Sequence, residues 1–236
     1  PAMPENEFVM MEFARRIGIA VPRLKLLPVS QIVGLPHGIR KGIADENATA
    51  LAVKRFDRMP GGRRVHVEDF AQVFAQFPER KYERRSSENI AAVLLTEIGE
   101  KAVIEFIRRI VFSMLIGNGD MHLKNWSLIY RNGQVPELSP AYDFVSTVPY
   151  LPKDKLALSF GGSKEMGSIS SDRIRRFADK TVLAPGPLWR SVKETIDEIA
   201  ETWRDYGRSD ILPHHVFESV NNHLKSVRKS ALMASI

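Results

Sequence analysis

Apolar residues recur at helical spacing near the start of this chain and again over much of its second half. Val9, Met10, Phe13 and Ile17 are spaced so that all four share one face of a helix, and Gly18 follows them directly. Side chains three and four residues apart line the same helical face, and glycine commonly ends a helix. The pattern therefore predicts a helix that begins near Pro4 and stops at Gly18.

Short apolar runs between Pro and Gly residues follow this helix. We expect strands at 21–27, 31–35 and 50–53, with a polar loop at 38–48. A Pro-Gly-Gly turn within 59–62 then marks a boundary. These elements predict half of a small sheet with one helix beside it.

Beyond residue 66 the pattern becomes mostly helical. We expect a loop region from Asp143 to about 167, and helices at 68–77, 89–98, 101–116, 188–206 and 213–234. The third of these helices carries a wide apolar face, which predicts that it is buried.

Two strands flank an Asn-Gly pair in the middle of this helical part. Residues 126–130 alternate in polarity, Asn132-Gly133 is a hairpin signal, and 135–138 predicts the returning strand. Such a hairpin would fold Asp143 back beside Asn125.

Composition limits the classes of protein that fit. The chain has 236 residues, 44% hydrophobic and 26% charged, as in a soluble globular protein of one or two lobes. We expect no membrane span, because charged residues interrupt the longest apolar run. Cysteine is absent, which excludes disulfides and thiolate metal sites and is compatible with the cytoplasm, the location we expect.

The formal net charge is +6. A basic surface that attracts anions explains this charge, and contact with nucleic acid is the alternative. We favour the first explanation, because the basic runs are short and no DNA- or RNA-binding motif accompanies them. Any DNA contact would then be indirect or weak.

The segment 117–125, Gly-Asn-Gly-Asp-Met-His-Leu-Lys-Asn, carries the chemistry that we single out, together with Asp143-Phe144. Kinases use an Asp, an Asn five residues later and an Asp-Phe pair beyond a hairpin. In such a site Asp120 orients or accepts the proton of a hydroxyl, while Asn125 and Asp143 hold Mg²⁺. Lys124 could neutralise charge on the transferred phosphoryl group.

The order of these residues points to one branch of kinases, because His122 follows the Asp instead of preceding it. With the stretches 4–8, 52–58, 67–70, 81–82, 138–144 and 156–158, the segment resembles the HipA family of bacterial toxin kinases. His122 either takes part in catalysis or braces the loop, and the sequence leaves both roles open.

This resemblance implies an α+β, protein-kinase-like fold of the HipA type, with a helix-rich large lobe at 59–236 and a partial small β lobe at 1–53. A connector at 54–58 would join the lobes. The resemblance implies that the backbone at Lys54, Arg55 and Phe56 binds the adenine of ATP, with Mg²⁺ as the second cofactor. From the residues alone, Phe56 is equally compatible with a packing role at the lobe junction.

The resemblance also implies a function. It predicts a serine/threonine protein kinase, the toxin of a toxin–antitoxin system that slows translation and growth and promotes persistence. Its target would be a protein such as an aminoacyl-tRNA synthetase, and its partner a small DNA-binding antitoxin.

Two kinase parts are not found where the resemblance requires them. A Gly-rich loop and a strand lysine that hold the phosphates would precede Glu5, where only four residues stand, and the glycines at 42, 61 and 62 follow the helix. We therefore expect a portion of a longer protein that binds Mg-ATP weakly by itself. Glu5, Glu7 and Glu12 are the candidates for the partner of that lysine.

Two other classes of function remain open. The chain could be a kinase-like binding module, held by the antitoxin and inactive in this form. Alternatively, Asp120, His122 and Asp143 could belong to a metal-dependent phosphohydrolase, which usually needs more His and Asp ligands. His214, His215 and His223 lack the ligand spacing of a metal site.

Overall fold

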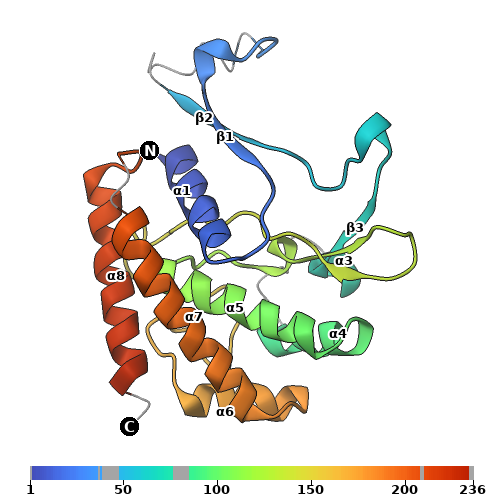
Figure 1. Ribbon diagram of the computed structural model, residues 1–236, viewed down its shortest axis with the longest axis vertical. Helices are drawn as coiled ribbons and strands as arrows, with labels where there is room; N and C mark the ends of the chain where they lie inside the picture. Colours follow the sequence, from blue (N-terminus) through green and yellow to red (C-terminus); the bar gives the residue numbers. More distant parts are fainter. Residues whose placement is uncertain (1, 37, 39–47, 77–84, 208–209, 234–236) are drawn as a thin grey trace.

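The computed structural model describes residues 2–36, 38, 48–76, 85–207 and 210–233 (Figure 1). Helix α1 spans Met3–Arg16. It is followed by the antiparallel pair β1, Leu24–Pro28, and β2, Thr49–Val53, in which Leu26 lies opposite Leu51. This two-stranded ribbon projects from one end of the molecule in Figure 1, above the helices.

A second sheet has three short antiparallel strands in the order β3-β4-β5. They are β3, His66–Asp69, β4, Ser127–Tyr130, and β5, Glu137–Leu138. The last two form the predicted hairpin around Asn132-Gly133, with Leu128 opposite Leu138. Two short 3₁₀ turns, η2 at Pro60–Gly62 and η4 at Leu123–Asn125, precede β3 and β4.

The remaining helices lie below the β1–β2 ribbon in Figure 1, with α3 beside β3. Their bounds are α3, Phe70–Val73; α4, Ser87–Glu97; α5, Glu100–Ile116; α6, Ser171–Thr181; α7, Pro185–Tyr206; and α8, His214–Met233. None of the helices within the described ranges has the length and apolarity that crossing a membrane requires.

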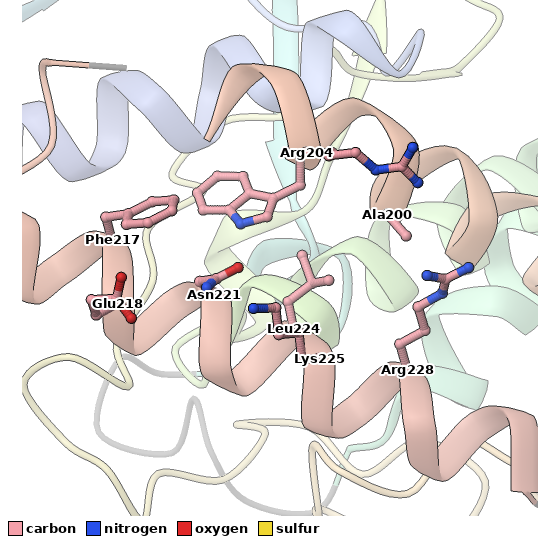
Figure 2. A pocket seen from close by; sticks show the side chains of 9 residues that line it. Ala200, Arg204, Phe217, Glu218, Asn221, Leu224, Lys225 and Arg228 are labelled. Atoms are coloured by element: carbon pink, nitrogen blue, oxygen red, sulfur yellow. The ribbon is translucent and has the colours of Figure 1, made fainter. Parts of the chain in front are cut away.

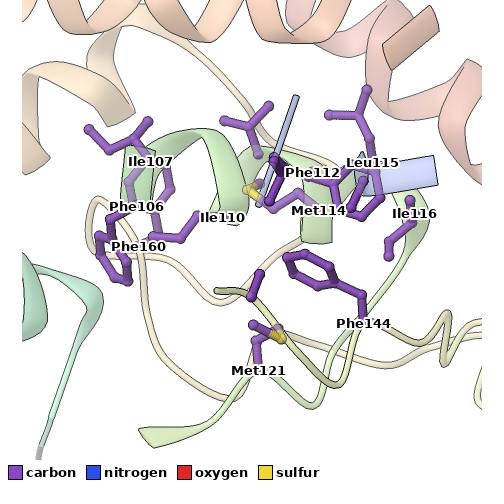
Figure 3. Packing of buried hydrophobic residues seen from close by; sticks show 14 of the residues in the cluster. Phe106, Ile107, Ile110, Phe112, Met114, Leu115, Ile116, Met121, Phe144 and Phe160 are labelled. Carbon is purple, nitrogen blue, oxygen red and sulfur yellow. The ribbon is translucent and has the colours of Figure 1, made fainter. Parts of the chain in front are cut away.

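Helix α5 supplies the centre of the core. Its Phe112 ring lies 5.2 Å from Phe13 of α1 and 4.9 Å from Phe144, the residue after Asp143 (Figure 3). Phe13 also contacts Trp203 of α7 at 5.1 Å. The first helix therefore shares one buried cluster with α5 and α7, and the segment that follows Asp143 is anchored to the same cluster. The division into lobes at 54–58 stays a prediction.

Several predicted elements are confirmed with small shifts of their ends: α1, β1, β2, α4, α5, α7, α8 and the hairpin. The strand predicted at 31–35 is wrong. Residues Val29–Gln31 form the short 3₁₀ helix η1, and no strand hydrogen bonding involves 31–35. Gly34 has a φ of 80°, a conformation that interrupts an extended chain.

The helix predicted at 68–77 is also wrong at both ends, because α3 covers only Phe70–Val73 and residues 74–76 are not helical. Residues 66–69 pair with β4 instead, and Asp69 then caps the single turn of α3 by accepting a hydrogen bond from the Gln72 amide at 2.9 Å. Helix α6 was not predicted at all. The interior of the predicted loop at 38–48, the Lys81-Tyr82 pair and the last residues of the helices predicted to end at 77 and 234 lie outside the described residues.

Candidate active site

The loop that carries Asp120 begins where α5 ends. Gly117 adopts the left-handed conformation, with φ 69° and ψ 45°, and closes the helix. A Cβ atom at this position would lie 2.6 Å from the Val148 side chain and 3.1 Å from His223. Only glycine fits both the conformation and the space. The start of the loop is therefore fixed by the packing around Gly117.

Asn118 connects the two aspartates through its side chain. It is fully buried, its oxygen accepts a hydrogen bond from the Asp120 amide at 3.1 Å, and its nitrogen donates to the Asp143 carbonyl at 3.5 Å, the long end of the range. One side chain thus links the backbones of Asp120 and Asp143. Motif spacing alone predicts no role for Asn118.

Asn125 and Asp143 are in direct contact. The Asn125 nitrogen donates to the Asp143 carboxylate, and the Asn125 oxygen accepts from the His122 amide at 3.1 Å. Asp143 has a φ of 62°, a conformation that is uncommon outside glycine and that tends to occur at functional sites. The hairpin therefore brings together the two residues that the sequence predicts as metal ligands.

Tyr142 braces the same loop. Its hydroxyl donates to the Lys124 carbonyl at 2.8 Å, and the Ser127 hydroxyl bonds to it in turn. Burial raises the pKa of Tyr142 to about 12, so the phenol remains a donor at neutral pH. Lys124 is thus held through its backbone, and the loop is tied to the residue before Asp143.

A cleft of about 520 Å³ opens beside these residues. Its volume lies within the range that small-molecule and cofactor sites occupy. Asp143, Tyr142 and Ser127 line the cleft together with the segment Lys54–Asp57. Asp120 is exposed and does not line this cleft. The structure therefore places the predicted metal ligand Asp143 and the predicted adenine-binding segment in one cavity.

The contacts of the connector limit how it could bind a base. The Lys54 amide already donates to the Arg23 carbonyl at 2.9 Å, and the Arg55 guanidinium pairs with Asp57 at 2.7–2.8 Å. The Phe56 ring lies 5.7 Å from the Tyr142 ring. These contacts engage the Lys54 amide and the Arg55 side chain, and the groups that could meet a purine are the Lys54 carbonyl, the backbone of Arg55 and Phe56, and the Phe56 ring face.

Of the three N-terminal glutamates, only Glu7 lines the cleft. Glu5 accepts a hydrogen bond from Thr49, and Glu12 pairs with Arg15 at 3.2 Å. Burial, together with the charge of Asp143, raises the pKa of Glu7 to about 7. Glu7 is therefore the one of these residues placed to act on a ligand in the cleft.

The side chains around the cleft fit a hard cation such as Mg²⁺. Glu7 and Asp143 are two of the four carboxylates that line the cavity, with Asp57 and Asp69, and the charge of Asp143 disfavours ionisation of Glu7. A cation bound between them would relieve this repulsion, and Mg²⁺ prefers such oxygen donors. For Asn125 to add its oxygen, the amide would have to turn and give up the bond from His122.

The remaining predicted residues occupy varied positions. His122 is buried in the loop, and Lys124 lies on η4 without lining the cleft. His223 is a structural residue, because its ring donates to the Met114 carbonyl at 2.8 Å and burial lowers its pKa. His214 lies near Glu218, 3.9 Å away.

Comparisons with known proteins show the fold and the family of this chain. The HipA protein of Shewanella oneidensis, solved as a "Toxin Antitoxin System HipA, HipB and its operator DNA complex", superimposes with a TM-score of 0.73 at 22% identity. The match covers 98% of this chain and 56% of that one. The "Putative kinase Y4dM" of Sinorhizobium fredii is 43% identical over 226 residues, 95% of this chain and 54% of that protein.

The "Serine/threonine-protein kinase toxin HipA" of Shewanella oneidensis is 26% identical over 196 residues, 74% of this chain and 41% of that protein. The chain thus spans about half the length of these relatives. Its fold is the kinase-like α+β fold of HipA. Residues 1–205 match the family described as HipA-like C-terminal domain, and the chain belongs to that family.

Proposed function

We propose that this chain is the catalytic portion of an ATP-dependent serine/threonine protein kinase. The observation that carries the proposal is the hydrogen-bonded connection among Asn118, Asp120, Asn125 and Asp143. This connection links Asp120, the candidate for orienting the acceptor hydroxyl, to Asp143, the candidate metal ligand. Asp143 lines a cleft that is large enough for a cofactor. Phosphoryl transfer depends mainly on positioning and charge stabilisation, which such a connection supplies.

In this proposal the exposed Asp120 orients the hydroxyl of the protein substrate and accepts its proton. Asp143, with Glu7 and Asn125 beside it, holds Mg²⁺, which would shield the phosphate charges of the nucleotide. The adenine lies against the Phe56 ring and bonds to the backbone of the connector. Lys124 supplies positive charge near the transferred group, and His122 braces the loop.

The wider biological role follows the relatives by analogy. The HipA of Shewanella oneidensis is named as a toxin, and its solved complex contains HipB and operator DNA. We propose a comparable DNA-binding partner for this protein, with DNA contact made mainly by the partner, and action in the cytoplasm. An aminoacyl-tRNA synthetase as the target, and a resulting arrest of growth, remain expectations from the resemblance.

The phosphohydrolase alternative has less support. Within the described part of the chain, no group of three or more His, Cys, Asp or Glu side chains is placed to hold a metal. The binding-module alternative predicts that the protein neither transfers nor releases phosphate.

One assay separates these functions. The whole natural protein is incubated with γ-labelled ATP, Mg²⁺ and a cell extract, and protein-bound label is compared with free phosphate. The kinase proposal predicts protein-bound label that depends on Asp120 and survives the matched change of an exposed aspartate on α6, Asp179→Asn. Rapid release of free phosphate without labelled protein would indicate a hydrolase. The absence of both labelled protein and free phosphate would indicate a binding module.

A further inference from the structure

A second cavity lies far along the chain from the connector, between helices α7 and α8. It has a volume of about 390 Å³ and is lined by side chains of both helices (Figure 2). We call it the α7–α8 groove. The family match ends at residue 205, so α8 lies outside the matched domain. The cleft of the proposed kinase site shares none of its lining residues.

The groove has an aromatic floor. The Trp203 and Phe217 rings stack with centroids 5.9 Å apart and an interplanar angle of 21°. Trp203 is only 4% exposed and also contacts Phe13 in the core. Its packing therefore does not depend on a ligand. The half-buried Phe217 ring is the part of the floor that an apolar side chain of a ligand could cover.

Two buried donors in the lining have no acceptor. Neither the Trp203 indole Nε1 nor the Arg228 Nε has a hydrogen-bond partner among the described residues. They come from opposite helices, and both residues line the groove. Buried N–H groups are rarely left unpaired, because their desolvation is then uncompensated. Neither lining acceptor, Glu218 or Asn221, bonds to them, and a ligand that brings oxygen atoms would add acceptors to the groove.

Positive charge gathers along the same groove. Figure 2 shows Arg204 reaching from α7 and Lys225 and Arg228 from α8 around the hollow. The Arg228 Nη2 pairs with Asp197 at 3.4 Å. The one lining acid, Glu218, sits at the opposite end beside His214. The oxygen atoms of the ligand would therefore be most favourable as carboxylates near the three cations.

The shape of the groove favours a peptide over a compact metabolite. Its lining on α8 runs from Phe217 to Arg228, which corresponds to about 16 Å of helix at the usual rise per residue. An extended chain covers this length with about five residues. An extended segment could place an apolar side chain on the aromatic floor and reach all three cations.

We propose that the α7–α8 groove binds an extended acidic peptide segment of a partner protein. A large apolar side chain of the segment packs on Phe217. Its carboxylates pair with Arg204, Lys225 and Arg228. This site is independent of phosphate transfer.

The test is a selection from a library of displayed seven-residue random peptides with the whole natural protein. Wild-type protein is compared with Lys225→Glu/Arg228→Glu and with Arg190→Glu/Lys193→Glu, a control on the exposed start of α7. We expect wild type and control to enrich peptides that carry Asp or Glu next to a large apolar residue. The groove variant should lose this enrichment.

The best enriched peptide is then labelled, and its binding is measured by fluorescence anisotropy. We expect its Kd to rise at least tenfold in the groove variant and less than twofold in the control. Arg204→Gln/Lys225→Gln, two exposed positions, replaces the groove variant if circular dichroism shows that the double Glu protein is unfolded. Absence of acidic enrichment in wild type, or equal binding by the groove variants, would overturn the proposal.

Discussion

The Asn125 side chain donates a hydrogen bond to the Asp143 carboxylate across 18 residues of sequence. Asn125 ends the turn η4 and Asp143 follows β5, so the β4–β5 hairpin lies between them. Because the two side chains touch, a charge added at Asn125 should change the stability of the protein. The effect of Mg²⁺ on that stability tests whether a cation binds at this pair, without a measurement of catalysis.

Asn125→Asp would place a second carboxylate against Asp143. Like charges in contact destabilise each other, whereas a divalent cation between them is stabilising. In the presence of EDTA we expect a loss of roughly 1–3 kcal/mol in the free energy of unfolding, a usual size for such a change. Excess Mg²⁺ should recover most of it, as measured by urea denaturation. Asn132→Asp, in the exposed hairpin turn, is the control, and an equal response of both variants to Mg²⁺ would argue against a metal site.

Gly117→Ala tests how tightly the start of the loop is packed. The left-handed conformation costs an alanine about 1–2 kcal/mol, and at Gly117 the new methyl group would also meet Val148 at 2.6 Å. Gly133 has a similar φ of 81° with open space around it. We therefore expect Gly133→Ala to show the conformational cost alone and Gly117→Ala to lose clearly more stability. Equal losses in thermal denaturation would show that the contact is not restrictive.

Glu7 should give stability a distinctive dependence on pH. Its pKa is raised from an ordinary value of 4.5 to about 7, so the folded protein holds this proton where the unfolded chain has lost it. Its contribution is fully present below pH 4.5 and is lost as pH rises through about 7. Relative to wild type, Glu7→Gln should remove this decline and leave the rest of the profile. If stability falls equally with pH in wild type and in Glu7→Gln, the pKa of Glu7 is not raised in the folded protein.

The buried Arg173 side chain is hydrogen-bonded to the loop at 160–168. Its guanidinium donates to the carbonyls of Phe160, Ser163, Glu165 and Ser168 at 2.6–2.7 Å, and burial lowers its pKa to about 10. Arg173→Met would leave these carbonyls without their donor. We expect a loss of more than about 3 kcal/mol, as for other broken buried networks.

The control for this change is Arg175→Met, an exposed position on the same helix α6. Hydrogen exchange should show faster exchange of the amides at 160–168 in the Arg173 variant alone. If the two variants were equally stable, the loop would not depend on Arg173.

Regular periodicity made much of the fold predictable. The apolar stripes of α1, α5, α7 and α8 and the Asn-Gly turn of the hairpin are local signals that the structure confirms. Helix α6 was missed because its eleven residues carry few apolar side chains and bury an arginine, Arg173, among them. β3 was missed because its pairing with β4 joins segments about 60 residues apart, which no local pattern reveals.

The candidate site was predictable in part for the same reason. Motif spacing predicted Asp120, Asn125 and Asp143 as site residues. Glu7 was one of three glutamates predicted as candidates for the partner of a lysine that binds the phosphates. The choice among those three depends on which helical face meets the cleft. The bracing roles of Asn118 and Tyr142 arise from hydrogen bonds across 18 to 25 residues. Asn118 stands inside the motif, so a search for buried amides beside catalytic carboxylates could have found it.

The two aspartates should differ in what they control. Asp143→Asn removes charge from the cleft, so we expect Mg-ATP binding and phosphate transfer to fall together. Asp120→Asn keeps the shape of an exposed side chain outside the cleft, so binding should stay near wild type while transfer falls. General-base catalysis contributes about 10²–10⁴-fold, which sets the smallest loss that we expect.

The most direct test of the kinase proposal is therefore the rate of γ-phosphate transfer by Asp120→Asn in the whole natural protein, beside calorimetric Mg-ATP binding and the Asp179→Asn control. The proposal predicts at least a hundredfold slower transfer with an unchanged Kd for Mg-ATP, and a control that matches wild type. Transfer by Asp120→Asn within tenfold of wild type would contradict it.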